Sequence, residues 1–204
     1  LVDALPARPW RYRAGQYVYL VVPSVRAWKA SALERHPFLI ASWNGEELSL
    51  IIQPREVFTK RMSTVAERGR QELALIDGPY GVTHDMSGFG TVIMIATGSG
   101  VIAFLSYIHE LLREYESESA VTRRIELIWK VDRDDQLLWV KRQVDQLLRD
   151  DRAKIFTISV FSKGPARTSL PAGSRVSLYS GHEFDVEKVL SNRLSRNTAR
   201  FLVA

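Results

Sequence analysis

The sequence contains no cysteine among its 204 residues. This absence excludes a disulfide framework, cysteine-ligated zinc and cysteine-ligated iron–sulfur clusters within this stretch. Histidine is also scarce, and the spacing of His36, His84, His109 and His182 does not follow that of a metal site, so no metal is expected. No apolar run approaches the ~20 residues that a membrane-spanning helix needs, and no signal peptide is recognisable.

The chain also lacks a strong excess of charge of one sign, and it lacks common catalytic motifs. The net charge is only +5, and the basic excess is spread along the chain. A nucleic-acid groove is therefore not expected, because such grooves gather basic residues on one face. There is no Gly-x-Ser-x-Gly nucleophile elbow and no Walker loop. The carboxylates are scattered, so no catalytic acid or base is predicted.

The first 80 residues carry short runs that are typical of β-strands. Prolines recur throughout this stretch and argue against long helices. Only residues 57–67 have the pattern of a short helix. The strand-like runs are bounded by Gly, Pro or charged residues and cover residues 17–22, 38–41, 48–52 and 73–76. Together they predict a small antiparallel β-barrel.

From residue 91 the pattern changes to alternating strands and helices. Residues 91–96 form a continuous apolar run, as a buried parallel strand does. Apolar residues then recur at helical spacing from Val101 to Tyr115. Further strands are expected at residues 125–129, 154–161, 175–179 and 200–204, with helices between them. This alternation predicts a parallel α/β sheet. We place the boundary within residues 82–90, which gives domains 1–82 and 90–204.

A glycine turn follows the first strand of the second domain. Gly98 and Gly100 allow the backbone to approach a pyrophosphate closely, and the helix that follows supplies free N–H groups. This predicts nucleotide binding, and a plain strand-to-helix turn is the alternative. Asp132 lies well beyond the ~20 residues expected for an acidic ribose ligand. Basic groups near strand ends instead suit a 2′-phosphate, hence NADPH over NADH, unless they are only solvated surface charges; they are Lys130, Arg133 and the Ser162-Lys163 pair.

A second motif, His36-Pro37-Phe38, opens an expected strand that continues to Ser42. An aromatic ring there can stack on a flat cofactor ring. The alternative is a barrel strand with a buried Phe and a turn His. Residues 15–17 (Gly-Gln-Tyr) and 78–81 (Gly-Pro-Tyr-Gly) are interpreted as turns.

Taken in order, these motifs resemble the ferredoxin–NADP reductase superfamily, and most closely its fungal ferric reductase and NADPH oxidase branch. The His-Pro-Phe start of the second motif points to the ferric reductase branch. The motifs that carry the resemblance are residues 14–17, 36–42, 58–61, 78–81, 97–101 and 127–129. The resemblance implies an N-terminal antiparallel FAD-binding β-barrel of ferredoxin-reductase type, followed by an α/β parallel-sheet nucleotide-binding domain.

The resemblance also implies site residues. Phe38 is expected against the isoalloxazine ring and Thr59 at the FAD pyrophosphate. The implied FAD ligands are His36, Pro37, Phe38, Leu39, Ile40, Ala41, Ser42 and Thr59. The implied NADPH ligands are Gly78, Pro79, Tyr80, Gly81, Thr97, Gly98, Ser99, Gly100, Val101, Ser162, Lys163 and His182.

The implied function is electron transfer. Family members pass hydride from NADPH to FAD, then single electrons to haem in a membrane domain, for the reduction of ferric or cupric chelates. Haem is expected only in that missing domain, which would be the electron-accepting partner. The chain would lie at the cytosolic face of a plasma, vacuolar or other internal membrane. The alternatives are a superoxide-generating NADPH oxidase, a soluble NAD(P)H reductase that serves a partner protein, and a degenerate, non-catalytic module.

Three departures from the family pattern stand out. Leu39 replaces a Thr or Ser and cannot donate a hydrogen bond near the flavin. His182 stands where many relatives have an Arg that helps to bind NADPH. Relatives also continue after the last strand into Cys-Gly-Pro. We therefore expect the second domain to be incomplete at its C-terminal end, and the barrel to lack an opening strand before Leu1.

Overall fold

The structure, a computed structural model, describes residues 1–7, 10–25, 35–45, 47–69, 71–133, 135–164, 175–181, 184–195 and 200–204. The chain divides into two compact units, Leu1–Thr83 and His84–Ala204. Each unit is built around its own β-sheet.

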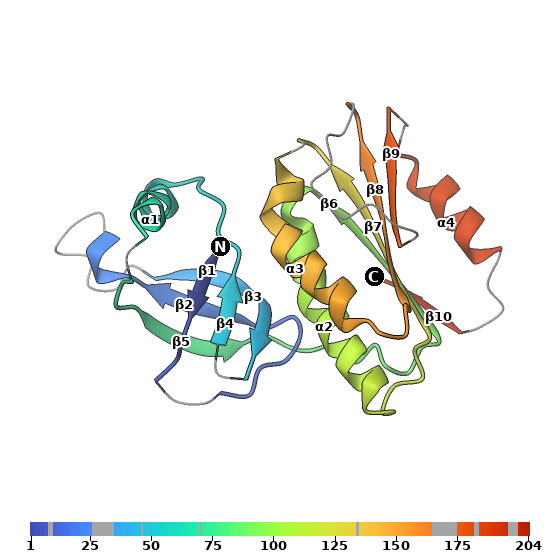
Figure 1. Cartoon of the computed structure of the whole chain (residues 1–204), viewed down its shortest axis with the longest axis horizontal. Helices are drawn as coiled ribbons and strands as arrows, with labels where there is room; N and C mark the ends of the chain where they lie inside the picture. Colours follow the sequence, from blue (N-terminus) through green and yellow to red (C-terminus); the bar gives the residue numbers. More distant parts are fainter. Residues whose placement is uncertain are drawn as a thin grey trace. The chain divides into compact units, whose positions relative to one another are not determined.

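The first unit contains an antiparallel sheet in the order β1-β4-β3-β2-β5 (Figure 1). Its strands are β1 (Val2–Ala4), β2 (Tyr17–Val21), β3 (His36–Asn44), β4 (Glu47–Leu50) and β5 (Leu75–Tyr80). A 3-10 turn, η1 (Pro23–Val25), follows β2, and the helix α1 (Val57–Glu67) lies between β4 and β5 in the sequence. The helix therefore has the bounds that the sequence predicts.

The long strand β3 organises this sheet. Its first half pairs with β2, and its second half pairs with β4. The register shifts between Ile40 and Ser42, and such bulges bend a strand. Side chains alternate between the two faces along each strand. Val18, Leu20 and Ile40 are among those that are almost fully buried.

Two features of the first unit differ from the sequence-based expectation. The short strand β1, which pairs with β4, was not predicted. The strand expected at residues 73–76 lies instead at Leu75–Tyr80. Gly78 and Pro79 therefore belong to a strand and not to a turn. A proline is tolerated there because β5 is at the edge of the sheet, where a missing N–H breaks no second ladder.

The second unit contains a parallel sheet in the order β10-β6-β7-β8-β9. Its strands are β6 (Thr91–Thr97), β7 (Arg124–Val131), β8 (Phe156–Ser162), β9 (Val176–Ser180) and β10 (Phe201–Val203). Its helices are η2 (Gly98–Gly100), α2 (Val101–Glu116), α3 (Gln136–Asp150) and α4 (Val186–Leu194). The predicted fold class, an antiparallel β domain followed by a parallel α/β domain, is confirmed.

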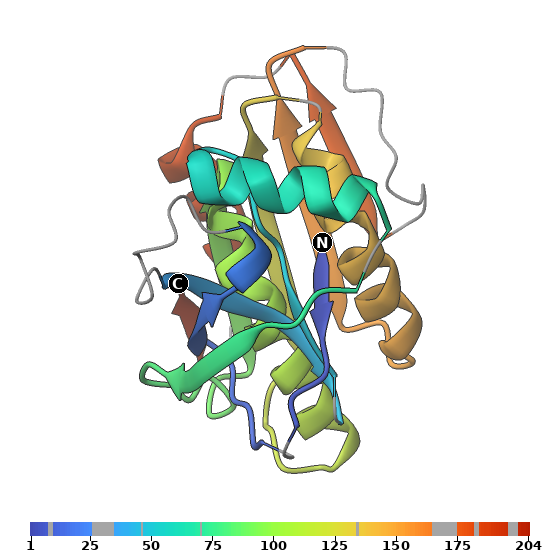
Figure 2. The same ribbon diagram turned by 90° about the vertical axis from the view of Figure 1, so that its left-hand side faces the viewer.

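The strand order creates a switch point between β6 and β10. The chain proceeds from β6 through β9 in one direction and then returns through α4 to β10 beside β6. Figure 1 shows α2 and α3 on one face of the sheet and α4 on the other, and Figure 2 looks onto the sheet from the side of α2 and α3. In open α/β sheets, ligands bind beyond the carboxyl ends of the strands at such a point.

The core of the second unit occupies both faces of the sheet. Under α4 lie Ile93, Ile128 and Phe161, which pack against Val189 and Leu190. Trp129 is fully buried, as is Met94 on the neighbouring strand. In the part of the chain that the structure describes, none of the helices has the length and apolar character needed to cross a bilayer.

Candidate functional site

The glycine turn lies at the switch point of the parallel sheet. Strand β6 ends at Thr97, and Gly98 follows with φ of +52°, in the left-handed region that favours glycine. The helix α2 starts at Val101, directly after the turn. Its N-cap, Gly100, has no side chain that can satisfy the first N–H groups of the helix. An anionic group is the ligand that such an uncapped N-terminus favours.

Strand β7 and the loop after it hold the turn from the side. The indole Nε1 of Trp129 donates a hydrogen bond of 2.9 Å to the carbonyl oxygen of Gly98. A Cβ atom on Gly98 would lie 3.0 Å from Oδ2 of Asp132 and 3.6 Å from Nε2 of Gln136. Gln136 in turn accepts a 2.9 Å bond from the Asp132 backbone N–H. A larger residue at position 98 would therefore meet both strain and a carboxylate.

The basic residues proposed for a 2′-phosphate separate into two groups. Lys130 pairs in register with Thr97, and Ser162 pairs with Val131, so both lie near the same edge of the sheet. Lys163 is exposed beside them. Arg133 instead bonds Asp135 through two nitrogens, at 2.9 and 2.5 Å. His182 lies outside the described residues.

In the first unit, three of the predicted FAD residues come together. The ring of His36 stacks on Phe58 of α1 at 4.2 Å between centroids, and Phe38 lies 6.4 Å from the same ring. Thr59 follows Phe58 directly. Its Oγ1 accepts hydrogen bonds from the backbone N–H groups of Arg55 and Glu56, at 2.9 and 3.0 Å. The start of β3 and the start of α1 therefore meet around one buried aromatic ring.

The other residues of this motif are distributed differently. Pro37 and Leu39 point to the opposite face of β3, where they line a surface hollow of about 340 Å³ with Tyr17 and Tyr19. Ile40 and Ala41 are buried, so only their backbone is available to a ligand, and Ser42 is half-buried. The eight predicted FAD ligands therefore do not share one surface.

The two glycine motifs of the first unit are neighbours, although they are far apart in the sequence. Tyr17 pairs with Tyr80 between β2 and β5. A Cβ atom on Gly78 would lie 3.2 Å from the carbonyl oxygen of Tyr17, and one on Gly81 would lie 3.3 Å from that of Gly15. All four residues of the 78–81 motif belong to the first unit. Their predicted role in NADPH binding stays a prediction.

Sequence reasoning missed some residues of these sites. It assigned no role to Phe58 or Trp129, although both lie within the motifs that carry the resemblance. It also passed over Tyr19, whose ring packs edge to face on that of Tyr17 at 5.7 Å. The spacing of two residues along a strand places both tyrosines on one face, and this signal was available.

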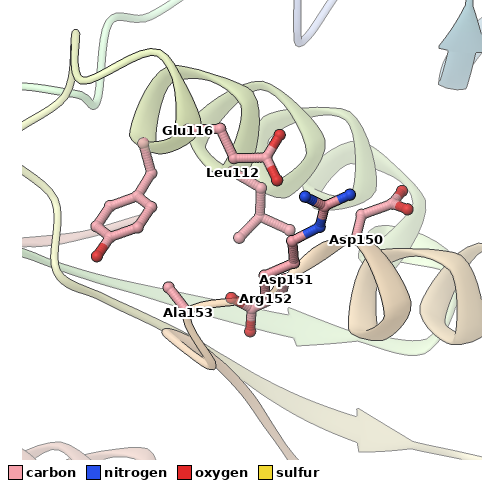
Figure 3. Close-up of a pocket in the computed structure, with 7 residues that line it drawn as sticks. Leu112, Glu116, Asp150, Asp151, Arg152 and Ala153 are labelled. Carbon is pink, nitrogen blue, oxygen red and sulfur yellow. The ribbon is translucent and has the colours of Figure 1, made fainter.

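A second hollow, of about 370 Å³, lies at the carboxyl ends of α2 and α3 and so away from the glycine turn (Figure 3). It is lined by Leu112, Tyr115, Glu116, Asp150, Asp151, Arg152 and Ala153. The carboxylate of Asp151 is committed to the fold, because it accepts bonds from the backbone of Ile155 and Phe156 and from Arg175. Among the described residues, no cluster of His, Asp or Glu has the arrangement of a metal site.

Comparison with known protein families identifies both units. Residues 4–84 match the model of a FAD-binding domain family, and residues 89–192 match that of the ferric reductase NAD binding domain. The chain belongs to the ferric reductase family. The glycine turn and the His36–Phe58 contact thus lie in the NAD-binding and FAD-binding domains of this family, respectively.

Ferric reductases from fungi and plants are similar in sequence. A probable cell surface ferric reductase from Aspergillus oryzae is 30% identical over 159 residues, which are 71% of this chain and 20% of that protein. Ferric reduction oxidase 4 from Arabidopsis thaliana is 30% identical over 113 residues, 53% of this chain and 16% of that protein. Ferric/cupric reductase transmembrane component 2 from Saccharomyces cerevisiae is 31% identical over 103 residues, which are 47% of this chain and 14% of that protein. The matched part is thus a fifth or less of each relative.

Solved structures share the fold at low sequence identity. The FAD/NAD-binding domain of nitric oxide dioxygenase from Vibrio cholerae has a TM-score of 0.55 at 13% identity, covering 99% of this chain and 90% of that one. The CS-b5R domains of human Ncb5or have a TM-score of 0.59 at 18% identity, and the match covers 95% of this chain and 53% of that one. Ferredoxin-NADP+ reductase from Plasmodium falciparum has a TM-score of 0.53 at 13% identity, and the match covers 95% of this chain and 72% of that one.

Proposed function

We propose that this ferric reductase module carries electrons from NADPH through FAD to haem in a membrane domain, for the reduction of ferric or cupric chelates. The observation that carries the proposal is the glycine turn at the switch point, directly before an uncapped helix N-terminus. When bound, FAD supplies the chemistry, because it accepts a hydride and releases single electrons. The protein supplies binding and orientation.

The first unit has groups that suit FAD. The half-buried ring of Phe38, which lies against the buried ring of Phe58, offers apolar surface to a flat ring system. The loop that enters α1 is ordered by the Thr59 hydroxyl, so the N–H groups at the start of α1 have a fixed direction. The Glu56 side chain already accepts a bond from the N–H of Thr59. The N–H groups of Val57 and Phe58 would bind the pyrophosphate, and His36 would lie beside it.

NADPH is the proposed nucleotide because Lys130, Ser162 and Lys163 lie near one edge of the sheet. A 2′-phosphate carries negative charge that Lys130 and Lys163 would neutralise. The carboxylate of Asp132, next to the glycine turn, would instead repel a phosphate.

The membrane haem domain is the proposed partner, and the cytosolic face of a membrane is the proposed location. Two relatives, a probable cell surface ferric reductase and a ferric/cupric reductase transmembrane component, support the membrane location. A non-catalytic module is the second candidate: a flavin on the face of β3 that carries Leu39, Tyr17 and Tyr19 would meet no side-chain hydrogen-bond donor at position 39.

The test is flavin reduction in the purified chain. The chain is loaded with FAD, and the flavin absorbance is followed without oxygen after addition of NADPH or NADH. We expect bleaching with NADPH at lower concentrations than with NADH. The variant Gly98→Val should keep FAD but lose nucleotide-driven bleaching, because a side chain there meets Asp132 and an unfavourable φ. Bound FAD that neither nucleotide bleaches would support the non-catalytic module instead.

A further inference from the structure

The hydrogen bond between Trp129 and Gly98 joins two neighbouring strands at the nucleotide turn. Trp129 pairs in register with Ala96, two residues before Gly98. Its side chain is fully buried, and its Nε1–H reaches past the end of β6 to the Gly98 carbonyl at 2.9 Å. Gly98 is itself buried. The bond therefore lies in the core, away from competing water.

This bond fixes more than one carbonyl group. The peptide unit is planar and trans, so its C=O and the following N–H point in opposite directions. The indole holds the Gly98 carbonyl toward the core. The N–H of Ser99 must then point away from the core, toward the region beyond the strand ends where a phosphate would lie.

The loop after β7 restrains the same residue from a second side. Oδ2 of Asp132 lies 3.0 Å from where a Cβ on Gly98 would be, and Gln136 accepts a bond from the Asp132 N–H. Position 98 therefore has no room on that side for a residue larger than glycine. Both restraints come from β7 and the residues that follow it, so the shape of the turn depends on the second strand and not on α2 alone.

We propose that Trp129 is a positioning residue that holds the turn in the conformation that binds the pyrophosphate of the nicotinamide nucleotide. The proposal rests on the proposed nucleotide binding at residues 98–100. It assigns the indole N–H, and not only the ring, a role in nucleotide affinity. Phenylalanine fills much of the same space but has no donor, so Trp129→Phe isolates the hydrogen bond.

The experiment measures nucleotide affinity in the FAD-loaded 204-residue chain. For Trp129→Phe we expect NADPH and NADH to bind about tenfold more weakly, the order expected when a buried carbonyl loses a donor. The FAD affinity should stay unchanged. In flavin reduction, KM for the nucleotide should rise by a similar factor while kcat changes little, because the lost contact prepares the site and does not touch the reacting atoms.

The matched control is Ile158→Val. Ile158 lies on β8 and is almost fully buried, and its replacement by valine removes one methylene from the same core. It should lower the melting temperature without changing nucleotide affinity. Equal affinities in the wild type and Trp129→Phe would overturn the proposal. So would an equal loss in Ile158→Val at a matched drop in melting temperature. A wild-type chain that binds neither nucleotide would instead overturn the proposed function.

A second measurement covers the case in which Trp129→Phe does not fold. In the wild-type chain, hydrogen exchange at the Trp129 indole N–H is followed by NMR with and without saturating NADPH. We expect slower exchange with NADPH, because the bound nucleotide stabilises the turn conformation in which Trp129 bonds Gly98. Protection that is identical in both samples would overturn the role of the indole.

Discussion

Glu126 of β7 and Arg193 of α4 form an ion pair of 2.8 Å between Oε1 and Nε, beneath the helix. The Glu126 side chain is 3% exposed and that of Arg193 is 23% exposed. Arg193 also donates a bond of 3.3 Å to Ser159 on β8. A second cation, Arg124, lies 3.4 Å from the same carboxylate but is more exposed. The helix that leads back to β10 is thus attached to the sheet by a charge contact as well as by apolar packing.

Loss of this ion pair should destabilise the second unit. We expect Arg193→Met to lower the free energy of unfolding by about 3 kcal/mol, because it leaves a buried carboxylate with a single, more exposed partner. The double variant Glu126→Gln with Arg193→Met should recover much of this loss. Urea unfolding measures both. Lys141→Met, which breaks the more exposed Lys141–Asp145 pair, is the control and should cost about 0.5 kcal/mol. Equal losses in Arg193→Met and Lys141→Met would contradict the prediction.

The face of β3 that binds the flavin can be decided with two neighbouring residues. We expect Phe38→Ala to weaken FAD binding about tenfold, because Phe38 lies on the face shared with His36 and Phe58. Leu39→Ala, on the opposite face of the same strand, is the matched control and should change the affinity little. Titration of the apoprotein with FAD measures both. The reverse result would place the flavin against Tyr17 and Tyr19.

Removal of the carboxylate beside the glycine turn should strengthen nucleotide binding. Asp132→Asn removes a negative charge next to the proposed pyrophosphate site, and between solvent-exposed groups in a water-like dielectric such a charge is worth about 1 kcal/mol. We expect NADPH to bind about fivefold more tightly at low salt, with a smaller gain at high salt. Asp135→Asn, which loses the partner of Arg133, is the control. An unchanged or weaker affinity in Asp132→Asn would show that the carboxylate does not face the phosphates.

The stability of the fold should fall on mild acidification. Burial, together with the nearby Arg113, lowers the pKa of His109 from its ordinary value. Above the unfolded-state pKa of about 6.5 the ring is neutral in both the folded and the unfolded state, so it does not change the free energy of unfolding. Below it the unfolded chain binds a proton that the folded chain does not, so stability falls by at most about 1.4 kcal/mol per pH unit.

Urea unfolding between pH 7.5 and 5 tests this pH dependence. His109→Gln should flatten the profile over that range, whereas the same change at the exposed His84 should not. A profile that His109→Gln leaves unaltered would assign the loss to other groups.

The extent to which the sequence predicts this protein depends on how local each feature is. The unit from β6 to α2 was predicted because its apolar run, glycine turn and helical spacing are contiguous. The position of β5 was wrong, because Gly78-Pro79 is typical of turns and only the edge position in the sheet permits a strand there. The separation of Phe38 from Leu39 follows from strand alternation alone.

Other features require the three-dimensional register. The bond from Trp129 to Gly98 exists because β6 and β7 pair so that Trp129 lies opposite Ala96, and no spacing along the chain shows this pairing. The same holds for Glu126 and Arg193, which are joined only by the packing of α4 on the sheet. Long-range pairing, not residue type, decides both contacts.

The place of β10 beside β6 has a consequence for synthesis. A ribosome translates Gly98 well before it translates Phe201, so β6 leaves the exit tunnel without its outer neighbour. For that interval the nascent chain presents an unpaired apolar strand, which is the kind of edge that invites misassociation. The switch point is complete only once translation has passed β10. Chaperone demand should therefore be greatest while the segment from β7 to α4 is being made.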